Sequence, residues 1–211
     1  MSAQPLTEPV VFIVHADPST RAWIEATVTS AGLHALSFET RAGLLPHVTT
    51  NAVACAILDV NLPDGCGLEL QSHLARAGVS IMFLTRERCI ASCVKAVRAG
   101  AVDFLTIPCS ALSLVQALRD ALRQAMSART LRLEFDELRL RYEQLTPRER
   151  QVFALVSSGL RNKQIAHQLE ISLITVQIHR RNVMTKMAPR SFASLVRMAD
   201  ALQGRILIPA T

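Results

Sequence analysis

Long apolar runs are missing from this chain of 211 residues, although half of its residues are apolar. A membrane-spanning helix needs about 18 or more consecutive apolar residues, and residues 1–5 have neither the basic nor the apolar segment of a secretory signal. We therefore expect a cytoplasmic protein without a membrane partner. Independent cores usually comprise about 100–200 residues, so the length suits one large domain or two small ones.

Cysteine is absent after residue 109, and the number of cysteines is odd. The five are Cys55, Cys66, Cys89, Cys93 and Cys109. None forms a CxxC pair, and no His or third Cys lies at ligand spacing from Cys89 and Cys93, which share one helix face. Buried, small apolar residues are therefore favoured over a redox pair or a metal site.

Acidic residues are scarce at the C-terminal end. Residues 145–211 contain 10 Lys/Arg against 3 Asp/Glu, a net charge of +7, whereas residues 1–126 contain 9 against 10 and residues 127–144 contain 4 against 4. Residues 171–198 contain no acid at all. Because a carboxylate would repel phosphate, this segment is suited to a polyanion, of which nucleic acid is the commonest.

Aromatic residues are scarce too, and this bears on which nucleic acid would bind. Phe153 and Phe192 are the only aromatic residues after Tyr142. Proteins that bind single-stranded RNA interleave aromatic side chains for base stacking, so RNA is a weaker alternative than duplex DNA.

Short apolar runs alternate with amphipathic stretches through the first 126 residues. Runs typical of buried strands are residues 10–14, 53–58 and 81–84, with weaker ones at 102–105 and 33–38. Amphipathic stretches typical of helices are residues 18–31, 41–48, 67–77, 89–99 and 110–126. This alternation predicts an α/β domain with a five-stranded parallel sheet, helices on both faces, and working residues at the carboxyl ends of its strands.

Glycine and proline are absent from residue 109 to residue 146, so the last of these helices can continue to about Gln144. Its second half, residues 127–144, is a helical linker in this interpretation. An apolar stripe spaced by fours and threes comprises Leu131, Phe135, Leu138, Tyr142 and Leu145. Because the stripe spans only two heptads, it fits a dimer seam and packing on the chain's own domains equally well.

Residues 145–211 begin with the sequence Thr-Pro-Arg-Glu at 146–149, which predicts a capping box at the start of a helix. The helix is expected to end at Ser157 or Ser158, before Gly159. Further helices are predicted at residues 162–169, 172–187 and 191–202, with a turn at 169–172.

The two middle helices of this segment form a helix-turn-helix, and the second is rich in basic residues. Such a second helix lies in the major groove of DNA. The inward contacts are expected among its apolar positions, Ile174, Val176, Ile178, Val183 and Met187. This leaves Gln177, Arg180, Arg181 and Lys186 as candidates for DNA contact.

Residues 145–150, 159–166 and 175–184 closely resemble the LuxR-type helix-turn-helix signature. The resemblance implies a four-helix domain with recognition helix 172–187, which binds duplex DNA as a homodimer on paired promoter half-sites. It places Gln177, Ile178 and Arg181 at base- and backbone-contacting positions. The full set of candidate DNA-binding residues is Lys163, Thr175, Gln177, Ile178, Arg180, Arg181 and Lys186.

Two positions depart from this signature. The family commonly has Lys where Gln177 stands, and Gln pairs with adenine, whereas Lys prefers guanine or phosphate. It usually has Gly where Glu170 stands, and a Glu with positive φ there costs about 1–2 kcal/mol.

With an α/β domain in front, the chain resembles the NarL/FixJ-type response regulators of two-component signalling. The implied organisation is a flavodoxin-like receiver domain at 1–126, the linker, and the LuxR-type domain at 145–211. Asp59, in Leu-Asp-Val-Asn-Leu-Pro-Asp-Gly at 58–65, matches the aspartate that a sensor histidine kinase phosphorylates. Thr85 matches the residue that binds the phosphoryl group, and Phe104 matches the aromatic switch.

Other residues that receivers use are missing. His15 and Ala16 stand where receivers have a pair of acids, and Ile107 stands where they have a lysine. Asp17 comes one residue later, where its side chain projects differently. On this interpretation the chain requires no cofactor; if Mg²⁺ binds, Asp17, Asp59 and Asn61 are its candidate ligands.

Our hypothesis is an atypical receiver that does not follow the usual Mg²⁺-dependent phosphate cycle, in which His15 supplies a pH-sensitive cation near Asp59. One alternative is a scaffold with a vestigial Asp59, and another is conventional phosphorylation of Asp59. A remote alternative is a phosphatase with an aspartyl nucleophile. Those enzymes have a second acid two residues after the nucleophile, where this chain has Asn61, and no Gly-rich phosphate loop or GxSxG motif is present.

Overall fold

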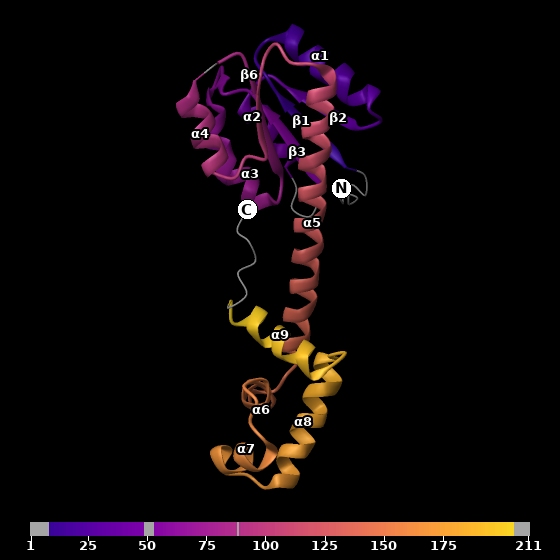
Figure 1. Cartoon of the computed structure of the whole chain (residues 1–211), viewed down its shortest axis with the longest axis vertical. Coiled ribbons are helices and arrows are strands. Elements are labelled where there is room, and N and C mark those ends of the chain that lie inside the picture. Colours follow the sequence, from indigo (N-terminus) through magenta and orange to yellow (C-terminus); the bar gives the residue numbers. More distant parts are fainter. Residues whose placement is uncertain (1–8, 49–52, 88, 205–211) are drawn as a thin grey trace. The chain divides into compact units, whose positions relative to one another are not determined.

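The computed structural model describes residues 9–48, 53–87 and 89–204 (Figure 1). The chain divides into two compact units within one long helix, the first reaching Thr130 and the second beginning at Leu131. Among the described helices, none is both long enough and apolar enough to cross a membrane.

Five parallel strands form the sheet of the first unit, in the spatial order β2-β1-β3-β6-β7. The strands are β1 (Val10–Val14), β2 (His34–Phe38), β3 (Ala54–Leu58), β6 (Ser80–Thr85) and β7 (Asp103–Thr106). The predicted five-stranded parallel sheet is therefore confirmed. Val14 of β1 pairs with Leu58 of β3, so the next residues, His15 and Asp59, emerge side by side at the carboxyl edge of the sheet.

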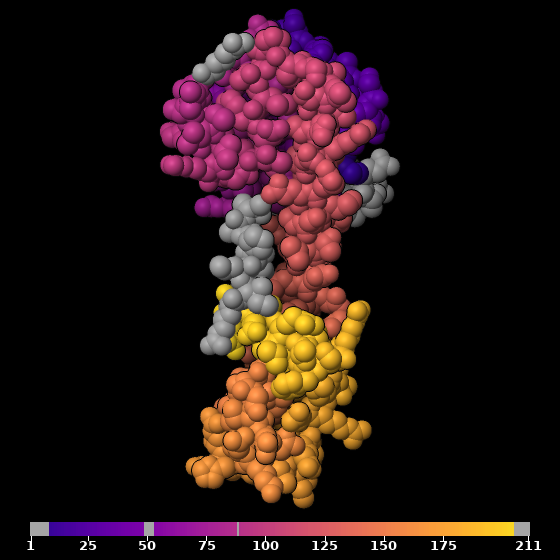
Figure 2. All heavy atoms as spheres, viewed as in Figure 1, coloured from indigo at the N-terminus to yellow at the C-terminus, as the bar shows by residue number. Residues whose placement is uncertain are grey.

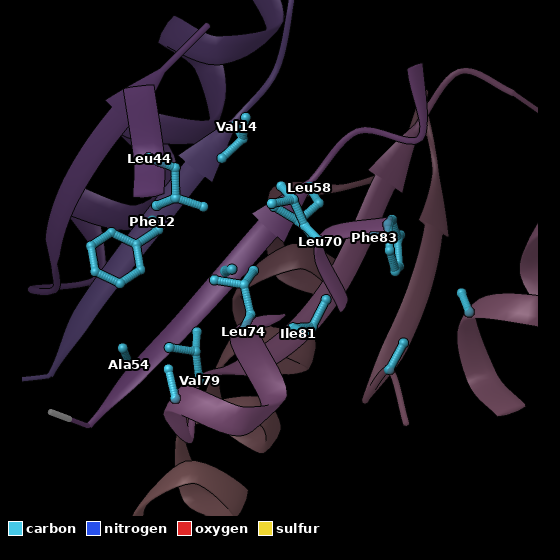
Figure 3. Close-up of a cluster of buried hydrophobic side chains, with 14 of the residues drawn as sticks. Phe12, Val14, Leu44, Ala54, Leu58, Leu70, Leu74, Val79, Ile81 and Phe83 are labelled. Carbon is cyan, nitrogen blue, oxygen red and sulfur yellow. The ribbon is translucent and has the colours of Figure 1, made fainter. Parts of the chain in front are cut away.

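Helices cover both faces of this sheet. Helix α1 (Pro18–Ser30) and the first turns of α5 (Ala111–Glu143) pack on one face, while α2 (Arg41–Leu44), α3 (Gln71–Ala77) and α4 (Ile90–Arg98) lie on the other. Alternate residues of each central strand point to opposite faces, and both faces are buried. Figure 3 shows one of the two resulting cores, whose members include Phe12, Val14, Leu44, Leu74 and Phe83.

Short elements account for the differences from the predicted helices. Instead of one helix over 41–48, α2 is followed by the 3₁₀ turn η1 (Leu45–His47). Instead of one helix over 67–77, the 3₁₀ turn η2 (Gly67–Leu70) precedes α3. Sequence analysis missed the hairpin of β4 (Asn61–Leu62) and β5 (Gly65–Cys66), because two-residue strands are too short to show periodicity.

Helix α5 continues without a break from the first unit into the second and ends one residue before the predicted Gln144. Leu138 and Tyr142, from its apolar stripe, and Leu145, which follows the helix, pack against the core of the second unit. Leu131 is exposed. The C-terminal half of the stripe therefore packs on the chain's own domain.

The second unit is the predicted four-helix domain, shown as packed atoms in Figure 2. Its helices are α6 (Pro147–Ser157), α7 (Asn162–Leu169), α8 (Leu173–Met187) and α9 (Phe192–Leu202). The capping box is present: the Thr146 amide donates to Glu149 Oε2 at 2.9 Å, and the Glu149 amide donates to Thr146 Oγ1 at 3.3 Å. The core includes Val152, Phe153, Ile165, Val176, Val183 and Met187.

Two of the five apolar positions considered on α8 do not belong to the core. Ile174 is 69% exposed and Ile178 is 55% exposed. Each lies two residues from Val176, which is about 200° around a helix that turns about 100° per residue. Since Val176 is buried, both isoleucines are turned to the outer face.

Candidate functional site

Asp59 follows β3 at the carboxyl edge of the sheet, and it is 8% exposed. Its amide donates to the Val14 carbonyl at 2.9 Å, which joins it to the end of β1. Gly67 fixes the same segment from the other side, because a Cβ atom there would lie 2.0 Å from the Asp59 carbonyl oxygen. Only glycine fits this close approach.

His15 lies against Asp59. Its imidazole is 3% exposed, and its Nε2 atom is 3.4 Å from Asp59 Oδ2. Nδ1 accepts a hydrogen bond from the Asp17 amide at 3.1 Å, so the neutral imidazole carries its proton on Nε2, toward Asp59. Burial lowers the pKa of His15 and outweighs the opposing effect of the charges on Asp59 and Asp17. At neutral pH His15 is therefore a neutral imidazole in place of the hypothesised cation, and its buried Nε2 atom forms no hydrogen bond with the described residues.

Asp17 caps helix α1. Its Oδ2 atom accepts hydrogen bonds from the Thr20 amide at 3.0 Å and the Thr20 hydroxyl at 2.5 Å, and it lies 3.2 Å from Arg86 Nη2. The Thr20 hydrogen bonds, with a smaller contribution from the Arg86 charge, hold the pKa of Asp17 below its usual value. This carboxylate is already engaged by three donors.

Asn61 lies exposed in strand β4, two residues after Asp59. Its side-chain amide donates to Glu87 Oε2 at 2.8 Å, and Glu87 Oε1 accepts from the Ser92 hydroxyl at 3.1 Å. Within the described ranges, no three His, Cys, Asp or Glu side chains gather in an arrangement that could hold a metal ion. With Asp17 and Asn61 engaged elsewhere and His15 beside Asp59, the residues present do not fit Mg²⁺.

The remaining predicted receiver residues also lie at or beside this edge. Thr85 ends β6, is 1% exposed, and accepts a hydrogen bond from the Glu87 amide at 3.2 Å. Phe104 is half-buried in β7, with its ring centroid 5.9 Å from that of Phe83. Ile107 donates its amide to the Thr85 carbonyl at 2.9 Å, and its side chain packs against the core next to α1 and α5.

Two arginines that contact residues 15–17 or helix α1 were not singled out from the sequence. Arg86 follows Thr85 directly, and its Nη2 atom lies 3.2 Å from both Asp17 Oδ2 and Thr20 Oγ1. Arg21, on α1, donates to the carbonyl oxygens of His15 at 2.5 Å and Ala16 at 3.2 Å. A basic residue directly after a strand-end threonine is the one signal that would have indicated Arg86.

The second candidate site is the outer face of α8. Gln177, Ile178 and Arg181 are exposed on this helix, and Lys163 is exposed on α7. Thr175 is half-buried in the first turn, where its amide donates to the hydroxyl of the N-cap residue Ser172 at 3.0 Å. The helix has no acid in its first turn. An exposed glutamine and an arginine on an acid-free helix can donate hydrogen bonds to base edges and phosphates.

Two other predicted DNA-binding residues hold α8 to its neighbours. Arg180 Nη1 donates to Asn162 Oδ1, on α7, at 2.8 Å. Lys186 Nζ donates to Glu149 Oε2, on α6, at 2.6 Å. Burial alone would raise the pKa of Glu149, but hydrogen bonds from Lys186, the Thr146 amide and Asn182, with the Lys186 charge, lower it to about 2. Glu149 is therefore an ionised, buried partner of Lys186.

The turn between α7 and α8 contains the second departure noted in the sequence. Glu170 has φ 54°, in the left-handed region, and caps the C-terminus of α7. Glycine adopts this conformation without strain, whereas other residues do so at a cost of about 1–2 kcal/mol. Glu170 has this conformation, so the cost expected from the sequence applies to it.

A five-stranded parallel sheet with an aspartate at its carboxyl edge, followed by a helix-turn-helix domain, defines a response regulator with a DNA-binding output domain. The family model "Response regulator receiver domain" matches residues 11–119, and "Bacterial regulatory proteins, luxR family" matches residues 143–199. The chain belongs to the response regulators of two-component systems that carry a LuxR-type DNA-binding domain.

Relatives match nearly the whole chain. The response regulator protein TmoT of Ectopseudomonas mendocina is 38% identical over 93% of this chain and 90% of its own length. The transcriptional regulatory protein FixJ of Rhizobium meliloti is 32% identical over 93% of this chain and 97% of its own length. Among solved structures, the response regulator StyR is 36% identical with a TM-score of 0.80, covering 92% of this chain and 100% of that chain.

Proposed function

We propose that this response regulator binds paired half-sites in duplex DNA as a homodimer, with α8 in the major groove. The observation that carries the proposal is the outer face of α8, where Gln177, Ile178 and Arg181 are exposed. Residues 171–198 contain no acid that would repel phosphate. A homodimer places two such helices on two half-sites, one on each.

The proposed contacts divide by chemistry. Gln177 and Ile178 face the base edges, where an amide pairs with adenine and an aliphatic chain packs on the thymine methyl group. Arg181, Lys163 and Thr175 contact the backbone. Arg180 and Lys186 orient α8 through their bonds to α7 and α6.

A binding titration of the full-length chain with duplex DNA and with RNA of the same sequence tests this proposal. We expect tighter binding to the duplex, falling steeply with salt. Removing a phosphate contact with Arg181→Ala is expected to lower the magnitude of the salt slope by about 1. Equal affinity for RNA, or a salt slope unchanged in Arg181→Ala, would count against it.

We infer further that the receiver is not controlled by the usual Mg²⁺-dependent phosphorylation. Phosphoryl transfer needs cations that neutralise developing charge. At the Asp59 edge a neutral His15 lies 3.4 Å from the carboxylate, the Asp17 carboxylate caps α1, and position 107 is an isoleucine packed on the core. This arrangement favours another input, or a receiver that serves as a scaffold for dimerisation.

Conventional phosphorylation by a sensor histidine kinase is the second candidate. Asp59 at the strand end and the buried hydroxyl of Thr85 favour it, since both are receiver residues in their expected places. Intact-mass measurement after incubation with acetyl phosphate and Mg²⁺ distinguishes the two. We expect no phosphoryl adduct, whereas an adduct in the wild type that is lost in Asp59→Asn would establish the conventional route.

A further inference from the structure

The outer face of α8 extends one turn beyond the residues assigned to DNA so far. Ile174, Gln177, Ile178 and Arg181 are spaced at i, i+3, i+4 and i+7, which places them on one side of the helix. All four are exposed, and Ile174 is the most exposed of the aliphatic residues on α8, at 69%. The face therefore has two apolar side chains that flank one amide.

Packing within the domain does not account for an isoleucine at position 174. Val176, Val183 and Met187 already join α8 to the core, and Ile174 is not among the residues that pack against that core. It is the second residue of the helix. Recognition helices contact base edges with their N-terminal residues, so Ile174 lies at the end of α8 that enters the groove.

The major groove has one apolar group for such a side chain, the C5-methyl group of thymine. Every other base edge there presents hydrogen-bond donors or acceptors, which an aliphatic chain would leave without partners. Gln177, one turn further on, pairs with adenine. The chemistry of this face therefore fits an A·T-containing step.

We propose that Ile174 is a specificity-determining residue that packs on a thymine methyl group, one helical turn before the contacts of Gln177 and Ile178. This rests on the proposed function, because α8 must first lie in the major groove. The expected effect is modest: burying one methyl group changes affinity about fourfold.

The experiment removes the methyl group from the DNA. A duplex that the full-length wild type enriches from a random pool is synthesised with uracil in place of each thymine in turn, which removes only the methyl group. At the thymine that Ile174 contacts in a half-site, which differs from the one proposed for Ile178, wild-type affinity is expected to fall about fourfold. Ile174→Ala is expected to bind the thymine duplex about fourfold more weakly than the wild type and to be indifferent to that replacement.

Two control variants are available. Ile178→Ala should keep the uracil effect at the thymine assigned to Ile174. Ile90→Ala changes an isoleucine that is 82% exposed on α4 of the first unit, and it should behave as the wild type at every thymine. Thermal melting checks that each variant remains folded.

The outcomes separate the two proposals. A wild type that binds no duplex overturns the proposed function together with this inference. A wild type that binds the duplex but loses nothing on uracil replacement overturns the inference and the thymine contact proposed for Ile178, while the proposed binding of duplex DNA stands. An Ile174→Ala variant that keeps the full uracil effect at every thymine overturns the inference alone.

Discussion

The Asp59 edge of the receiver and the outer face of α8 differ in where their polar side chains point. At the Asp59 edge, Asp17 is bonded to Thr20 and Arg86, and Asn61 is bonded to Glu87. On α8, Gln177 and Arg181 project outward and are exposed. One site directs its polar groups toward the protein, and the other leaves them exposed.

The contrast shows which kind of function tolerates substitution. Phosphoryl transfer needs several charged groups at one point, so we expect His15, Ala16 and Ile107, in place of the acid pair and the lysine, to impair this chemistry as a whole. DNA binding by a helix adds up separate contacts on a folded scaffold. A change such as Gln177 for lysine then alters the preferred base while the binding mode persists.

The largest expected effect concerns the ion pair of Lys186 on α8 with Glu149 on α6. Lys186→Met leaves the buried Glu149 carboxylate without its ammonium partner. Loss of one partner of a buried ion pair costs about 3–5 kcal/mol, and because the Lys186 side chain is 32% exposed we expect about 2–3 kcal/mol here. Urea unfolding, followed by the signal of Tyr142, the only tyrosine, measures it.

Lys163→Met is the matched control, because Lys163 is an exposed lysine of the same domain. It should change the free energy of unfolding by no more than about 0.5 kcal/mol. Equal effects of the two substitutions would show that Lys186 does not stabilise the domain through Glu149, and Lys186 would return to the candidates for DNA contact.

A smaller effect is expected at the turn before α8. Glu170→Gly relieves a left-handed conformation and should stabilise the output domain by about 1 kcal/mol, since the greater freedom of glycine in the unfolded chain offsets part of the gain. Gln168→Gly, within helix α7, should instead destabilise it by about 1 kcal/mol. If Glu170→Gly also destabilises the domain, the strain assigned to this turn is absent.

The smallest expected effect is a loss of stability at lower pH that differs between the two units. The pKa of His15 is lowered on folding, so the unfolded chain binds more protons, and the receiver loses stability as pH falls below about 6.5. The pKa of Glu149 is lowered from 4.5 to about 2, so its contribution is complete above pH 4.5 and is lost as pH falls toward 2. Between pH 7 and pH 5, only the receiver should weaken.

The chain has one tryptophan and one tyrosine, and each reports on a different unit. Trp23 lies on α1 of the receiver and Tyr142 packs on the output domain, so urea unfolding at pH 7 and pH 5 can be followed separately for each. His15→Gln should remove the decrease seen by Trp23. A decrease of the same size in that variant would assign the acid sensitivity to other groups.

The sequence predicts the secondary structure well where the physical signal is local. Residues 10–14 are apolar throughout because β1 is buried on both faces, and the Thr146–Glu149 capping box fixes the start of α6 within one turn of chain. The β4–β5 hairpin left no periodic signal, because its strands have two residues each.

The candidate sites are harder to predict, because their contacts join distant segments. Arg86 meets Asp17 from 69 residues away, and Lys186 meets Glu149 from 37 residues away. Apolar periodicity alone did not separate Ile174 and Ile178 from the inward positions of α8, because an isoleucine on the outer face of a helix cannot be told from a buried one by its residue type. Only the positions of Val176 and its neighbours in space separate the two cases.

The most direct test is the affinity of the full-length chain for the duplex it selects, measured with and without acetyl phosphate and Mg²⁺. We predict tight binding in both conditions, with the same dissociation constant, because we propose that α8 supplies the DNA contacts and that the receiver is not controlled by Mg²⁺-dependent phosphorylation of Asp59. A large gain in affinity with acetyl phosphate and Mg²⁺, abolished by Asp59→Asn, would contradict this account.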